Sequence, residues 1–135
     1  MFDPGEFLRL ADLIGVADAA PHPQARFRSA VSRAYYAAFL TAREVLRPHL
    51  GNSVVDKKRG VHDVVIKALS WGDPGSGLRG PGAVLRQLKK DREQHDYDLP
   101  LTSNSTLAKA AAADAEKIIR DLASLDASKC YKGPF

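Results

Sequence analysis

Apolar residues recur at spacings of three and four along most of the chain, and no run alternates apolar with polar residues. Spacings of three and four are the signature of an α-helix with one buried face, whereas strict alternation is typical of a half-buried strand. The chain is therefore predicted to be all-α. We expect an up-and-down bundle of four to five helices.

Proline and glycine mark where the predicted helices begin and end. Asp3-Pro4 is expected to start the first helix, and Pro48, Gly51 and Asn52 are expected to end the second. The five glycines and two prolines of residues 72–82 predict a mobile loop. The helices are expected at about residues 4–19, 24–46, 59–71, 83–95, and from the polar turn at 102–105 to about 125.

The fourth predicted helix changes character along its inward face. Leu85, Leu88, Arg92 and His95 follow one stripe, which passes from apolar to charged. A guanidinium buried without a partner costs roughly several kcal/mol. Arg92 therefore needs an ion pair, exposure near the helix end, or a binding site. In a site, Arg92 would hold a phosphate and His95 would move protons near neutral pH. The candidate ion-pair partners are Asp91, Asp96 and Asp98.

Length and composition predict one soluble domain. The chain has 135 residues, 44% of them hydrophobic, so we expect one core within residues 1–127 and a C-terminal tail at 128–135. Cys130 is the single cysteine, which excludes an internal disulfide. The acidic start lacks the basic region of a signal peptide, and no run of 18 apolar residues is present. We therefore expect a cytoplasmic protein with no membrane contact.

Positive charge is the compositional signal that bears most on partners. The net charge is +4, from 20 basic and 16 acidic side chains, which favours anionic partners weakly. Gathered on one surface, the basic residues would neutralise about two or three phosphates, whereas on solvated helix faces they would bind nothing. They cluster in two segments: Lys57, Lys58 and Arg59, and Arg86, Lys89, Lys90 and Arg92.

Several chemistries are excluded by missing motifs. The chain has no GxxxxGK[ST], CxxC, HExxH or GxSxG motif, which argues against nucleoside triphosphatases, zinc enzymes and serine hydrolases. His22 and His62 lack a second ligand at helical spacing, so we expect no metal and no cofactor. Tyr35 lies on the predicted core stripe. Tyr36 lies off it beside Arg33, so these two are candidate binding residues, with Tyr36 stacking on bases.

Two segments together resemble the signature segments of prokaryotic HEPN domains. The first is SRAYYAAF at residues 32–39, and the second is REQHDYD at residues 92–98, where His95 stands at a position commonly occupied by alanine. The resemblance covers roughly residues 5–125. It implies a HEPN-like bundle of four or five helices, commonly a homodimer whose later conserved helices face each other across a cleft. It also implies RNA or a nucleotide as ligand, in a toxin-antitoxin or defence setting.

The resemblance also implies candidate catalytic residues. Ribonuclease members carry arginine, then four to six residues, then histidine, whereas here four residues separate His95 from Lys90 and two separate it from Arg92. A metal-independent ribonuclease would use His95 as general acid or base, with Arg92 or Lys90 stabilising the phosphate. Tyr97 matches the tyrosine of toxins that a nucleotidyltransferase antitoxin modifies. It is therefore a candidate modification site if such a partner exists.

Three functions remain open from the sequence. The first is an RNA- or nucleotide-binding module without a regular catalytic motif, in which Arg92 and Asp96 hold the cleft together. The second is the ribonuclease toxin, acting as a dimer. The third is an oligomerisation element, which would explain the alanine-rich last helix and leave the inward charged pair unexplained.

Overall fold

The structure is a computed structural model of the chain, and it describes residues 3–6, 8–9, 23–97 and 105–135. Within those ranges the chain is helical and contains no strand, so the all-α prediction is confirmed. Most of the first predicted helix, 4–19, lies outside the described residues. The other elements are α2 (Pro23–Leu50), α3 (Asn52–Val55), α4 (Val61–Ser70), α5 (Arg79–Tyr97), α6 (Ser105–Ser124) and the 3₁₀-helix η1 (Ala127–Lys129).

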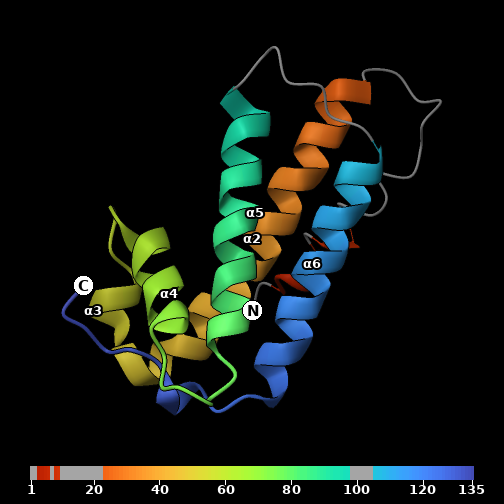
Figure 1. Cartoon of the computed structure of the whole chain (residues 1–135). Coiled ribbons are helices and arrows are strands. Elements are labelled where there is room, and N and C mark those ends of the chain that lie inside the picture. Colours follow the sequence, from red (N-terminus) through yellow and green to blue (C-terminus); the bar gives the residue numbers. More distant parts are fainter. Residues whose placement is uncertain (1–2, 7, 10–22, 98–104) are drawn as a thin grey trace.

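The three long helices form the body of the molecule. Figure 1 shows α2, α5 and α6 side by side, with α5 running opposite to the other two, and α3 and α4 beside one end of this group. Helix α2 packs against all the other labelled elements, and α4 packs against α5. No helix in the described ranges is long and apolar enough to cross a membrane.

The buried faces follow the predicted stripes. On α2, the alanines at positions 30, 34, 38 and 42 are fully buried at one-turn spacing, which allows a neighbouring helix to approach closely. On α6, Ala108, Ala111, Ala115, Ile118 and Leu122 are buried as the spacing predicts. Leu85 and Leu88 of α5 are buried in the same core cluster as these residues of α2 and α6. The long helices thus share one apolar core.

Two predicted helix boundaries are wrong. Helix α2 passes through Pro48 and ends at Leu50, because a proline in the last turn removes one hydrogen bond without unwinding the turns before it. The chain then leaves the helix at Gly51, whose φ of 88° suits glycine. Helix α5 begins at Arg79, four residues before the predicted start. Pro81 is tolerated there because the first-turn N–H groups have no partner within a helix.

The segment 128–135, expected as a tail, packs against the bundle. Cys130 is 4% exposed. The Tyr131 N–H donates to the Ala68 carbonyl at 2.8 Å, and the Asp73 N–H donates to the Lys129 carbonyl at 2.9 Å. These bonds hold residues 129–131 beside the C-terminal end of α4. The chain then continues to its end beside α3 and α4, as Figure 1 shows.

Helices α4 and α5 meet at Gly82. A Cβ on Gly82 would lie 2.7 Å from the backbone nitrogen of Ser70 and 2.9 Å from its Cα. Contacts this short force the backbone of one helix to move. Gly82 therefore sets the distance between α4 and α5.

We expect Gly82→Ala to lower the free energy of unfolding by about 1–3 kcal/mol, because the added methyl group overpacks this contact. Gly80→Ala is the matched control, since it lies in the same first turn with nothing within 4 Å of its Cβ position. The control should leave stability unchanged or raise it by about 0.4–1 kcal/mol. Urea unfolding followed by circular dichroism measures both, and equal effects would contradict the assigned role of Gly82.

Candidate functional site

Arg92 lies on α5 and its side chain contacts α2. Its Nη1 donates a hydrogen bond to the Tyr36 hydroxyl at 2.7 Å. The guanidinium carbon lies 5.3 and 5.2 Å from the ring centroids of Tyr35 and Tyr36. An aromatic face attracts a cation by about 0.5–2 kcal/mol. Asp91, one of the acids considered as an ion-pair partner, instead accepts a hydrogen bond from Gln87 at 2.9 Å. The two tyrosines therefore stabilise the Arg92 charge.

His62, which has no second metal ligand at helical spacing, belongs to the same cluster. Its Nδ1 lies 2.6 Å from the Tyr35 hydroxyl, and its ring stacks on Phe39 with centroids 4.1 Å apart. Burial lowers the pKa of His62, and the nearby charges of Arg92 and Lys89 lower it further. Burial also raises the pKa of the Tyr35 phenol. The cluster thus favours a neutral imidazole beside a protonated phenol.

His95 is buried, as its stripe predicts, and it has different partners from Arg92. It is 6% exposed, and its Nδ1 lies 2.7 Å from the Asp91 carbonyl oxygen. Its Nε2 is buried without a hydrogen-bond partner among the described residues. The ring borders a small cavity of about 90 Å³ between α2, α5 and α6, whereas Arg92 contacts the α2 tyrosines. The described lining of the cavity beside His95 therefore does not include Arg92, whose contacts are with the α2 tyrosines.

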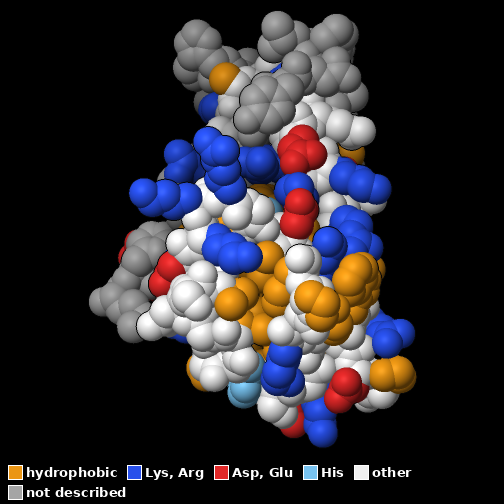
Figure 2. Space-filling view, turned by 90° about the vertical axis from the view of Figure 1, so that its left-hand side faces the viewer, with side chains coloured by type: hydrophobic (Ala, Val, Ile, Leu, Met, Phe, Trp, Pro, Cys, Tyr) orange, Lys and Arg blue, Asp and Glu red, His pale blue; other side chains and the backbone are white. Residues whose placement is uncertain are grey.

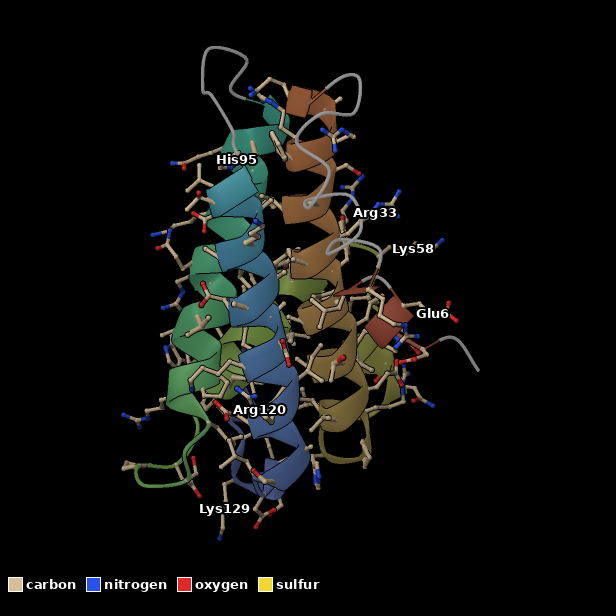
Figure 3. The ribbon with its side chains drawn as sticks, turned by 90° about the vertical axis from the view of Figure 1, so that its right-hand side faces the viewer. Glu6, Arg33, Lys58, His95, Arg120 and Lys129 are labelled. Carbon is tan, nitrogen blue, oxygen red and sulfur yellow. The ribbon has the colours of Figure 1, made fainter. Side chains whose placement is uncertain are left out.

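The remaining predicted site residues are dispersed. Arg33 donates to the Ser29 hydroxyl at 3.2 Å and lies apart from His95, as Figure 3 shows. Tyr36, its predicted companion, is engaged with Arg92. Asp96 and Tyr97 fall in the last turn of α5, and their side chains lie outside the described residues.

A hollow with basic lining lies between α4 and α5. Its volume is about 390 Å³. A second hollow of about 220 Å³ adjoins it and shares Asp63 and Lys67 with it. We call the two hollows together the basic groove. Its charged lining consists of Lys57, Arg59, Lys67, Arg86, Lys89 and Lys90, with the acids Asp63 and Glu93.

The basic groove combines the two basic segments that the sequence showed apart. Lys89 is held by Asp63 and Glu93, each at 3.3 Å. The other five cations form no ion pair with a described carboxylate. Arg92, expected with this set, is absent from the lining. The groove therefore presents excess positive charge in a concave surface, the arrangement that suits phosphate groups.

No protein-family model, no curated protein and no solved structure matches this chain. The HEPN resemblance thus stays a prediction. Among the described residues, no three His, Cys, Asp or Glu side chains are grouped to hold a metal ion.

The His62 cluster predicts a pH-dependent stability. Because the folded state lowers the His62 pKa below its ordinary value of 6.5, the unfolded state binds protons more readily. Stability should be fully present above that value and fall as the pH drops through it toward the lower folded pKa. From about pH 7.5 to about pH 5.5, the melting temperature should fall less for His62→Gln than for the wild type. His49→Gln, an exposed histidine, is the control and should keep the wild-type fall. Parallel curves for wild type and His62→Gln would contradict the prediction.

Proposed function

We propose that this protein binds RNA, with the phosphates held in the basic groove between α4 and α5. The observation that carries the proposal is the convergence on adjoining hollows of six cations: Lys57, Arg59, Lys67, Arg86, Lys89 and Lys90. Of these, only Lys89 forms an ion pair with a described carboxylate. Neutralising phosphates releases the counterions condensed on a nucleic acid, which drives binding. RNA is chosen over other polyanions because of the resemblance to HEPN domains.

The groove has the features of a backbone-binding surface. Arg86 offers a planar fork for bidentate contact with a phosphate, and Lys67 and Lys90 offer point charges. Lys89 is held between Asp63 and Glu93, which offset its charge, so the excess positive charge of the groove comes from the other five cations. Such contacts position a nucleic acid without reading its sequence. The proposal therefore predicts strong salt dependence and weak sequence preference.

The test is a paired charge reversal. Arg86→Glu with Lys90→Glu should weaken binding of a labelled single-stranded RNA by roughly tenfold at low salt and make the salt dependence shallower by about 1.4 logarithmic units per unit of log salt. The control, Lys109→Glu with Arg120→Glu, changes the net charge equally on α6, outside the groove lining. Fluorescence anisotropy at several salt concentrations measures both. Equal losses in the two double variants would show non-specific attraction only and would overturn the groove assignment.

RNA cleavage is not part of this proposal. A general acid or base must reach the proton that it transfers, and His95 is 6% exposed with Nδ1 directed at the Asp91 carbonyl. The toxin-antitoxin setting, the homodimer and the nucleotidyltransferase that would modify Tyr97 stay predictions from the resemblance.

A nuclease assay tests whether the protein binds RNA without cleaving it. Mixed transfer and messenger RNA incubated with the protein in EDTA should stay intact, and the His95→Ala variant should behave identically. Cleavage by the wild type, lost in His95→Ala of equal thermal stability, would establish a metal-independent ribonuclease and contradict the restriction to binding.

A further inference from the structure

We propose that Trp71 and Phe135 form a stacking platform for unpaired bases at the end of the basic groove, so that the RNA bound is single-stranded. This inference rests on the proposed function and adds the class of RNA that the groove takes. Proteins that bind single strands combine a basic groove for the backbone with aromatic rings for the bases. The described residues provide both features side by side.

The platform is a cluster of three aromatic side chains. The Trp71 and Tyr131 ring centroids are 5.2 Å apart, and those of Tyr131 and Phe135 are 5.4 Å apart, each pair edge to face. Trp71 is 50% exposed and Phe135 is 39% exposed. Among the described residues, only Leu107 is a comparably exposed large hydrophobic side chain, and it lies on α6. Trp71 and Phe135, two of the three exposed large hydrophobic side chains among the described residues, therefore belong to one cluster.

Hydrogen bonds hold the platform in a defined position. The Tyr131 N–H donates to the Ala68 carbonyl in α4 at 2.8 Å, and the Tyr131 hydroxyl donates to the Pro134 carbonyl at 2.7 Å. Trp71 directly follows α4, and its N–H donates to the Lys67 carbonyl at 2.9 Å. Rings that are already positioned lose little conformational entropy when a base stacks on them.

The platform adjoins the groove through Phe135 and Lys67. Phe135 lines the smaller hollow together with Lys57, Arg59 and Lys67. The Lys67 ammonium lies 5.3 Å from the Trp71 ring centroid, and Lys67 also lines the larger hollow. Figure 2 shows the face that lies on the left in Figure 1, where the C-terminus is marked, and on it hydrophobic side chains are bordered by Lys and Arg side chains. A strand that runs from the hollow between α4 and α5 past Lys67 into the second hollow would therefore pass from phosphate-binding cations to exposed rings.

Charge favours a single-stranded polyanion over other occupants. A second copy of this chain would bring Lys57, Arg59 and Lys67 of both copies together, and like charges repel. A duplex keeps its bases stacked on each other, so the rings would find no free base face. Single-stranded RNA supplies both the phosphates for the cations and the base faces for Trp71 and Phe135.

Trp71 is the only tryptophan of the chain, so its emission reports directly on the platform. The experiment titrates the full-length protein with an unlabelled single-stranded RNA and, in parallel, with a duplex of equal length. We expect the single strand to quench the emission with the same midpoint as the anisotropy measurement. The duplex should give little quenching.

Variants separate stacking from electrostatic attraction. Trp71→Ala and Phe135→Ala should each weaken single-strand binding by about tenfold, the effect expected of one lost base stack. Trp71→Phe should recover most of the affinity, since it keeps a ring. Leu107→Ala, the exposed hydrophobic residue on α6, is the control and should bind like the wild type. Thermal melting followed by circular dichroism verifies that each variant is folded.

The outcomes distinguish this inference from the proposed function. Binding that depends on Arg86 and Lys90, with no quenching and no effect of Trp71→Ala, would overturn the platform and leave RNA binding in place. No binding of any RNA would overturn both. Self-association that Trp71→Ala abolishes, without quenching by RNA, would also overturn the platform by assigning the rings to contact between copies.

Discussion

Helix α2 is the element around which the other described elements pack, and its fully buried alanines are the constraint on which that packing depends. Small side chains at one-turn spacing let α6 and α5 approach the α2 backbone closely. Larger residues between them, such as Val31 and Tyr35, fill the remaining space. Because α4 also packs against both α2 and α5, its position follows from the same contacts.

The polar cluster of Tyr35, Tyr36, His62 and Arg92 is a consequence of this packing. Tyr35 is 0% exposed, so its hydroxyl needs a partner, and the Nδ1 of His62 on α4 supplies one. Arg92 reaches the same place from α5 and contacts both tyrosine rings. Three helices are thus joined by one set of polar and aromatic contacts. Among the described residues, the inward charge of Arg92 is thus held by two tyrosines of α2.

The basic groove and the aromatic platform lie on the outer side of that arrangement. Helix α5 turns Arg92 toward α2 while Lys89 and Lys90 face the groove shared with α4. The C-terminal segment adds Tyr131 and Phe135 by bonding back to α4. The proposed RNA-binding surface is therefore formed by elements from the middle and the end of the chain. His95, in contrast, lies buried in the core.

Local patterns in the sequence were sufficient for the all-α class, for the buried stripes of α2 and α6, and for the burial of His95, because helical periodicity alone dictates which residues share a face. They misplaced the start of α5 and the end of α2, where packing tolerates Pro48 and Pro81 inside helical turns. Only the tertiary structure decided that His62 meets Tyr35, 27 residues away, and that two basic segments line one groove. Such contacts depend on the rotation and the separation of neighbouring helices. Packing between distant segments sets both, so the spacing of residues within one helix cannot predict them.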